Sequence, residues 1–257
     1  MKITHKLANI ILAIVIMYYS SVIYASKLTI VTEHLAPFQI VESNSITGFS
    51  TEIVKAALDE SGLEYGIEAF PWSLSFNRAM QEEDICIYSL ARIPDRELLF
   101  QWVGHITTST ISFYTLKEKT LKISNLHDAK KYKTAVIKDD VTHHFLLSKG
   151  FIEGTNLYVM SNYDALLKLL ETPSRQIDLI IINDDLINNR VKSKQDAAKY
   201  QNVHMLDELT LDFYFACSLS TDKRVVGQLI TVMEELEASG LYLTIRDKWK
   251  KRMVNLM

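Results

Sequence analysis

Two long strand-like segments bracket the second half of the chain, and they constrain its fold more than any other feature. Thr108 to Leu116 and Leu211 to Leu219 are rich in β-branched and aromatic residues, which favour extended backbone. Strand-like and helix-like segments alternate before the first of them, and the alternation starts again between the two. This order predicts an α/β chain in two halves.

The alternation predicts a defined set of elements in each half. Before the first long segment we expect strands over Leu28–Thr32, Glu64–Phe70 and Asp84–Leu90 and helices over Phe49–Glu60 and Leu74–Met80. Between the long segments we expect strands over Lys133–Ile137, Leu157–Met160, Ile177–Ile182 and Val203–Leu206 and helices over Val141–Lys149 and Tyr163–Leu170. Two helices, over Lys223–Ala238 and Leu241–Lys251, complete the chain.

These elements predict two lobes joined by two crossings. The first lobe comprises residues 26–115 and 208–257, so that the final helices pack on it, and the second comprises residues 116–207. Two crossings make a hinge, and the cleft between such lobes is where a small ligand binds.

Ligands of open α/β sheets gather at the carboxyl ends of the strands, and this rule selects candidate residues. In the first lobe it selects Glu33, Trp72 and the two arginines of the loop after the third strand, Arg92 and Arg96. An arginine presents a rigid fork of donors that matches a carboxylate. In the second lobe the rule selects acidic and amide residues, namely Asp139, Asp140, Asn183, Asp184 and Asp185. A cation facing acids across a cleft suits a zwitterionic solute.

The composition and motifs exclude several other classes of protein. The 257 residues carry 28 Lys and Arg against 31 Asp and Glu, a net charge of −3, which argues against a nucleic-acid partner. The sequence has no nucleophile elbow, zinc-protease motif or phosphate loop, and we expect no enzyme and no cofactor. His143 and His144 beside Asp139 invite a metal interpretation, but adjacent histidines point in different directions, so we expect no metal.

The amino terminus has the order of a secretory signal peptide. Lys2 and Lys6 precede an apolar run, and small residues follow it up to Ala25. We therefore expect residues 1–25 to be a signal peptide, cleaved near Ala25, that sends the protein to the periplasm. The alternative is an uncleaved anchor helix. Cleavage removes two lysines and no acids, and so changes the net charge from −3 to −5.

Cys86 and Cys217, the only cysteines, each lie in an apolar strand-like run. We favour two buried thiols that act as small hydrophobic side chains, with a disulfide between them as the alternative in an oxidising compartment.

Short motifs in the correct order resemble the family 3 solute-binding proteins over Lys27 to Arg252. They are Ala36-Pro37-Phe38, Gly48-Phe49-Ser50-Thr51-Glu52-Ile53, Ala91-Arg92-Ile93-Pro94-Asp95-Arg96, Ile177-Asp178-Leu179-Ile180 and Lys248-Trp249. The resemblance implies a two-lobe periplasmic-binding fold of type II and a receptor for polar amino acids or related solutes. It gives Arg96 the role of carboxylate anchor, makes Ser89 and the backbone at Ala91 hydrogen-bond partners, and makes Trp72 an aromatic wall.

The sequence departs from the family pattern at two places, and the candidate residues also have simpler alternative roles. Leu35 replaces the usual aromatic residue, and Asp139-Asp140 replaces Gly-Thr, which places acids where a ligand carboxylate would be repelled. The alternative to a ligand-binding role for Arg96 is an ion pair with Asp95 or Glu97 on the surface. The other candidates have core packing (Trp72), helix capping (Asp140) and a solvated loop acid (Glu33) as theirs.

The sequence therefore predicts a periplasmic solute-binding protein, monomeric, that delivers a small amino-acid-like or amine solute to the membrane permease of an ABC importer. The candidate ligand-binding residues are Glu33, Trp72, Ser89, Ala91, Arg96, Asp140, Asn183 and Asp184. The alternatives are a ligand sensor for a membrane receptor and, less favoured, a dehydratase-like enzyme in which Glu33 or Asp140 acts as general base.

Overall fold

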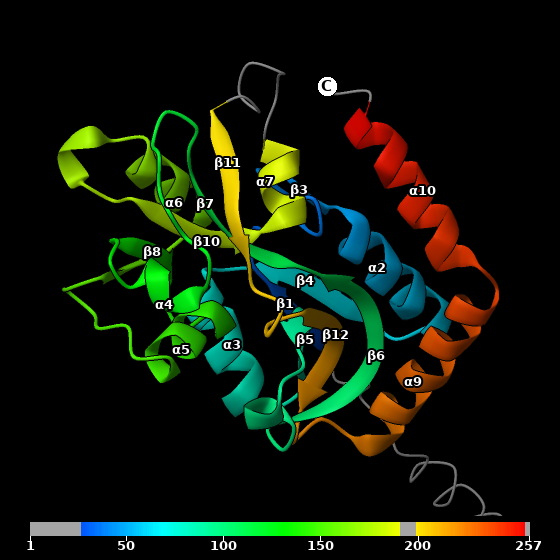
Figure 1. Ribbon diagram of the computed structural model, residues 1–257. Coiled ribbons are helices and arrows are strands. Elements are labelled where there is room, and N and C mark those ends of the chain that lie inside the picture. The colour runs from blue at the N-terminus through cyan, green and yellow to red at the C-terminus, as the bar shows by residue number, and fades with distance from the viewer. Residues whose placement is uncertain (1–26, 191–198, 255–257) are drawn as a thin grey trace, which may run out of the picture.

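The structure is a computed structural model that describes residues 27–190 and 199–254. It contains two five-stranded sheets, each with helices packed against it (Figure 1). The predicted signal peptide lies outside the described residues. No helix among residues 27–190 and 199–254 is long and apolar enough to cross a membrane.

The first sheet has the strand order β4-β1-β5-β12-β6. Its neighbours β4, β1 and β5 run parallel, and β12 runs antiparallel between β5 and β6. Every residue of β5 is buried, as expected for a strand covered on both faces. The elements of this lobe are β1 (Leu28–Thr32), β2 (Ile40–Glu42), β3 (Ser45–Thr47), α2 (Phe49–Ser61), β4 (Tyr65–Ala69), α3 (Trp72–Gln81), β5 (Ile85–Ala91), η1 (Pro94–Arg96), β6 (Phe100–Ser109), β12 (Leu211–Ser218), α9 (Lys223–Ala238) and α10 (Leu241–Val254).

The second sheet has the strand order β11-β7-β10-β8-β9. Strand β10 is buried along its whole length and pairs with β8 in parallel and with β7 in antiparallel orientation. The elements of this lobe are β7 (Ile111–Leu116), α4 (Leu126–Ala129), β8 (Thr134–Ile137), α5 (Val141–Ser148), β9 (Leu157–Met160), α6 (Tyr163–Leu170), η2 (Pro173–Arg175), β10 (Leu179–Asn183), α7 (Asp184–Arg190) and β11 (Tyr200–Met205).

Helices cover the first sheet on both faces. Helices α2, α9 and α10 lie together at the right of Figure 1 and contact one another, whereas α3 packs on β1, β5 and β12 from the side of the second lobe. The turn before α2 needs glycine, because a Cβ at Gly48, whose φ is +118°, would clash with the carbonyl of Phe38. The amides of Phe49 and Ser50 instead bond to the carbonyls of Pro37 and Phe38, which fixes the loop after β1.

The chain passes between the sheets at Thr110. The single strand expected over Thr108–Leu116 is in fact the end of β6 and all of β7, because β6 pairs with β12 in one sheet and β7 pairs with β10 in the other. Strand β6 also begins at Phe100, earlier than expected. Its glycine and histidine weaken the strand pattern, but Gly104 lets α9 approach closely, since a Cβ there would meet the side chain of Met233.

Cys86 and Cys217 form a disulfide. They are register partners on the neighbouring antiparallel strands β5 and β12. The favoured interpretation of two free thiols is therefore wrong, and the alternative is correct. The physical reason is the return of β12 to the first sheet, where it lies beside the central strand β5, which sequence separation alone does not reveal.

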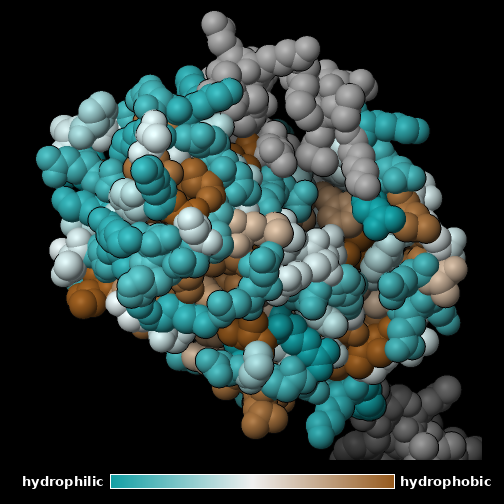
Figure 2. All heavy atoms as spheres, in the orientation of Figure 1, coloured by the Kyte–Doolittle hydropathy of each residue, from teal (hydrophilic) through white to brown (hydrophobic). Residues whose placement is uncertain are grey.

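The surface is predominantly hydrophilic, with hydrophobic side chains in separate patches on the face shown in Figure 2. The large apolar residues exposed within the described ranges are scattered over both lobes: Leu74, Leu98, Leu147, Ile152, Met205, Leu219 and Leu243.

Candidate functional site

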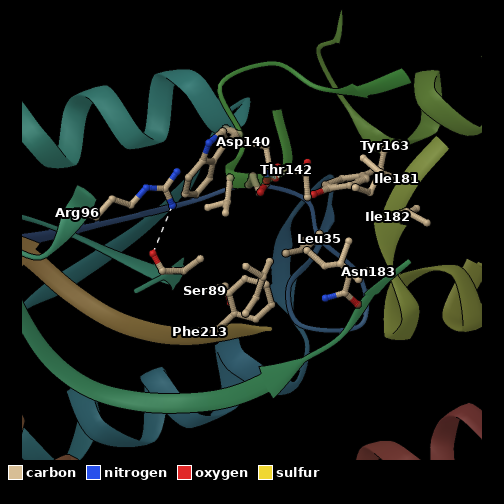
Figure 3. A pocket seen from close by; sticks show the side chains of 16 residues that line it. Leu35, Ser89, Arg96, Asp140, Thr142, Tyr163, Ile181, Ile182, Asn183 and Phe213 are labelled. Atoms are coloured by element: carbon tan, nitrogen blue, oxygen red, sulfur yellow. Dashed lines mark hydrogen bonds between the residues drawn. The ribbon is translucent and has the colours of Figure 1, made fainter. Parts of the chain in front are cut away.

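A small cavity lies between the two lobes (Figure 3). Its free volume is about 20 Å³, which is room for about one water molecule. Both lobes line it, through Glu33, Leu35, Trp72, Ser89, Ala91, Arg96, Leu211 and Phe213 of the first and Ile111, Asp140, Val141, Thr142, Tyr163, Ile181, Ile182 and Asn183 of the second. The lobes are therefore closed on each other, and a solute needs an open form to enter.

The structure brings most of the predicted residues together. Seven of the eight candidates line the cavity: Glu33, Trp72, Ser89, Ala91, Arg96, Asp140 and Asn183. They follow or end the strands β1, β4, β5, β8 and β10, as the carboxyl-end rule requires. Asp184 lies outside the lining, and its carboxylate accepts hydrogen bonds from Thr110 Oγ1 at 2.5 Å and from Tyr114 Oη at 2.8 Å.

Arg96 is the one cationic side chain among the described residues that line this cavity. It ends the short helix η1 and is 5% exposed. Its guanidinium carbon lies 5.3 Å from the ring centroid of Trp72 and 4.8 Å from that of Phe76. Nη1 donates to the carbonyl of Ala91 at 3.4 Å, the dashed line in Figure 3. Within the described residues no carboxylate forms an ion pair with it, so its charge is available to an anionic group.

Burial lowers the pKa of Arg96 to about 10, although the nearby carboxylates of Asp140 and Asp95 oppose the change. The side chain is still a cation at neutral pH. Such a group is costly to bury without a partner, and a bound carboxylate would compensate that cost.

Arg92 competes with Arg96 in the sequence but lies elsewhere. Its guanidinium forms an ion pair with Glu97, with N–O distances of 2.9 and 2.5 Å, and lies over the rings of Trp102 and Tyr214. It does not line the cavity. The surface pairing considered for Arg96 with Glu97 is therefore made by Arg92.

Glu33 is a buried acid at the end of β1, 8% exposed. Burial raises the pKa of its carboxyl well above the usual value, and the negative charge of Asp140 raises it further. The carboxyl holds its proton to higher pH than a surface glutamate. A cationic group placed beside it would favour the ionised form.

Asp140 and Asn183 both cap helices and both face the cavity. Asp140 accepts hydrogen bonds from the amide and the hydroxyl of Thr142, each at 2.8 Å, which confirms the helix-cap interpretation. The Asn183 side-chain oxygen accepts from the amides of Asp185 and Leu186. Its Nδ2 is buried and makes no hydrogen bond within the described part of the chain. An unsatisfied buried donor lining a cavity is a contact point for a ligand acceptor.

Trp72 and Ser89 complete the first-lobe side. The indole nitrogen of Trp72 donates to the carbonyl of Asp139 at 3.0 Å, a hydrogen bond that joins the two lobes directly. Ser89 has a positive φ of 56°, and its hydroxyl donates to Gln39 Oε1 at 2.8 Å. The hydroxyl proton of Ser89 is thus already engaged, and its oxygen can only accept.

Sequence reasoning missed the apolar part of the wall. Phe213, Leu211 and Ile111 lie on the two crossing strands, and Tyr163 begins the helix after β9. The carboxyl-end rule applied to β9 would have selected Tyr163. No comparable sequence signal identifies which side chains of a crossing strand face the cleft. The cavity thus combines apolar walls with a few polar groups, as small-molecule sites do.

Asp139, His143 and His144 form a candidate metal site, but the hydrogen bonds of His143 compete with metal binding. Potential ligand atoms of Asp139, His143 and His144 lie within 4.8 Å of one another. His143 already uses both ring nitrogens, since Nδ1 accepts from the Asp139 amide at 3.2 Å and Nε2 lies 2.9 Å from Glu153 Oε1. A bound ion would have to displace one of these hydrogen bonds.

Residues 28–252 match the profile of the bacterial extracellular solute-binding proteins, family 3. The chain belongs to this family. No curated protein matches it in sequence. The family and the similar solved structures are binding proteins, and the fold is the two-lobe α/β fold of type II periplasmic binding proteins, as the sequence predicts.

Three solved structures illustrate the likeness. A histidine kinase sensor domain with similarity to periplasmic binding proteins superposes with a TM-score of 0.77 at 15% identity, covering 87% of this chain and 96% of that one. The P235GK mutant of ArgBP from T. maritima superposes with a TM-score of 0.74 at 16% identity, covering 88% of this chain and 95% of that one. The arginine-, lysine-, histidine-binding protein ArtJ from Geobacillus stearothermophilus superposes with a TM-score of 0.73 at 16% identity, covering 87% of this chain and 94% of that one. At such identities these structures show the shared fold alone.

Proposed function

We propose that this family member captures a small zwitterionic or cationic solute, an amino acid or a related amine, in the cavity between its lobes and delivers it to an ABC importer. One observation carries the proposal. Arg96 is a buried guanidinium without an ion-pair partner among the described residues, and it lines the same cavity as two acids, Glu33 and Asp140.

The arrangement suits a ligand with charges of both signs. A carboxylate on Arg96 would provide the missing partner of the buried cation. An ammonium near Glu33 and Asp140 would favour the ionised form of Glu33 and pair with both acids. The free Nδ2 of Asn183 would donate to a ligand oxygen. We assign the ligand-binding role to these residues together with Trp72, Ser89 and the backbone at Ala91.

Binding requires the lobes to separate and close again. The solute binds the open form, the second lobe rotates about the crossings near Thr110 and residues 206–210, and the closed form docks on its membrane partner. The Trp72–Asp139 hydrogen bond forms on closure because its two ends belong to different lobes. One chain supplies the whole cavity, which supports action as a monomer. Function in the periplasm requires the leader at residues 1–25.

A sensor is the second candidate. The likeness to a histidine kinase sensor domain shows that a closely similar fold serves that role in another protein. A gene for a permease beside this one would favour import, and a gene for a membrane sensor would favour signalling. Recovery of a bound solute unchanged after prolonged incubation would exclude the dehydratase-like alternative.

A thermal-shift screen of residues 26–257 tests the proposal. The protein is unfolded, freed of any co-purified solute and refolded, and is then screened against amino acids, amines, organic acids and short peptides. A solute that binds only the folded state raises the melting temperature. We expect stabilisation by zwitterions or amines. Stabilisation by plain organic anions alone, or by no member of these classes, would refute the proposal.

A further inference from the structure

A second, larger hollow lies beside the buried cavity. Its free volume is about 330 Å³, against about 20 Å³ for the inner cavity. It also lies between the lobes, with Phe76, Asn77 and Asp95 contributed by the first and Asp139 and His144 by the second. We call it the outer chamber. At about 30 Å³ per water molecule it has room for about ten, enough for a substantial part of a ligand.

Among residues 27–190 and 199–254, Arg96 is the only one that lines both spaces. Its guanidinium lies over the ring of Trp72, which lines the inner cavity, and over the ring of Phe76, which lines the outer chamber. The Trp72–Asp139 hydrogen bond lies at the same boundary, because Asp139 lines the outer chamber and its neighbour Asp140 the inner cavity. The side chains of Arg96 and Trp72 therefore form part of the partition, together with the backbone carbonyl of Asp139.

The charges are alike on the two sides of this partition, because Glu33 and Asp140 line the inner cavity and the guanidinium of Arg96 is shared by both spaces. The outer chamber is lined by Asp95 and Asp139, and Arg96 is the only arginine or lysine among the described residues of its lining. The guanidinium is 5% exposed and has no ion-pair partner among the described residues. A group that occupies the outer chamber would thus meet two acids, and the guanidinium at the partition would be free for a carboxylate next to that group.

From this geometry we propose that the outer chamber is a second ligand subsite and that the solute is a dipeptide-sized, peptide-like molecule with a small first residue and a cationic second residue. The inference rests on the proposed function and specifies its substrate class. The first ammonium lies by Glu33 and Asp140 and the carboxylate lies on Arg96. The cationic side chain enters the outer chamber, near Asp95 and Asp139. The small inner volume limits the first residue.

Four probes test the proposal by calorimetry with the refolded protein: glycine, lysine, glycyl-lysine and glycyl-norleucine. Glycyl-lysine should bind at least about tenfold more tightly than each of the other three. The comparison with glycyl-norleucine isolates the charge, since the two side chains have similar length. The comparison with glycine isolates the second residue, and the comparison with free lysine isolates the glycyl residue.

Two variants localise the effect. Asn77→Trp places a large side chain in the outer chamber and should weaken glycyl-lysine at least about tenfold while changing lysine by less than about twofold. Leu74→Trp is the matched control, because Leu74 is exposed on the same helix but does not line the chamber. Asp139→Asn keeps a residue that tolerates the positive φ of 59° there, and should reduce the preference for glycyl-lysine over glycyl-norleucine.

Tight binding of lysine or glycine with no gain from the second residue would overturn the two-chamber inference and leave the proposed function intact. An undiminished affinity of Asn77→Trp for glycyl-lysine would overturn it as well. If none of the four probes binds while another zwitterion or amine does in the screen, the peptide class is wrong and the receptor function stands. Failure of the whole screen refutes both.

Discussion

We propose that Arg96 binds the ligand although its burial destabilises the solute-free protein, and this predicts an unusual mutant. Replacing it by methionine, Arg96→Met, removes the charge but keeps an apolar chain that reaches about as far as Nε of the arginine. An arginine needed only for the fold would lower stability when it is removed. We expect the opposite, a more stable solute-free protein.

The magnitude follows from the surroundings of the side chain. Burial lowers the pKa of Arg96 to about 10. Since each pKa unit is worth about 1.4 kcal/mol, this costs the folded state on the order of 3 kcal/mol at neutral pH. The two cation–π contacts with Trp72 and Phe76 return about 1 kcal/mol each. The net gain on substitution is about 1 kcal/mol, or a rise of roughly 2–4 °C for a chain of this size.

The assay is differential scanning calorimetry at pH 7 on protein that has been unfolded, stripped of solute and refolded. Residual solute would stabilise the wild type and hide the effect. Arg92→Met is the matched control. Arg92 also lies over two aromatic rings but is exposed and paired with Glu97. Its loss should lower the melting temperature slightly, because favourable contacts disappear without relief of a burial cost. A fall of several degrees for Arg96→Met would refute the reasoning.

Three further predictions concern stability and closure. Burial raises the pKa of Glu33, so the ionised carboxylate destabilises the folded state; this cost is absent below the ordinary glutamate pKa and grows as the pH rises. Glu33→Gln should therefore raise the melting temperature more at pH 8 than at pH 5. Parallel curves of melting temperature against pH for the two proteins would contradict this. Trp72→Phe removes the hydrogen bond to the Asp139 carbonyl, which is worth about 0.5–1.5 kcal/mol, and should therefore favour the open form roughly 2- to 12-fold. X-ray scattering of the solute-free protein should show a larger radius of gyration. An unchanged radius would argue that this hydrogen bond does not hold the lobes together. The double variant Cys86→Ala, Cys217→Ala removes the disulfide, which joins residues with a sequence separation of 131, and should lower the free energy of unfolding by about 2–5 kcal/mol in denaturant titrations. Unaltered stability would mean that the disulfide is absent in solution.

The polar part of the site was predictable because it depends on chain order. Residues that follow strands of a parallel sheet meet at one edge, and this rule alone selects Glu33, Trp72, Arg96 and Asp140. The rule does not distinguish between residues of the same loop. Asn183 ends β10 and faces the cavity, whereas Asp184 begins α7 and turns to Thr110 and Tyr114.

The features that escaped prediction depend on which strands become neighbours. The disulfide requires β12 to lie beside β5, and the cleft-facing side of Phe213 is set by the pairing of β12 with both β5 and β6. Alternation along a strand defines two faces but does not say which one meets the other lobe. The choice between Arg92 and Arg96 likewise needed the structure, because both stand in the same loop and both lie over aromatic rings.

The central claim is that a solute binds between the lobes on Arg96. The most direct test is a calorimetric titration of the strongest solute from the screen into the wild type, Arg96→Met and Arg92→Met, all refolded free of solute. We predict one site per chain in the wild type, a loss of at least about 100-fold in affinity for Arg96→Met, and wild-type affinity for Arg92→Met. Equal affinity in the wild type and Arg96→Met would contradict the account.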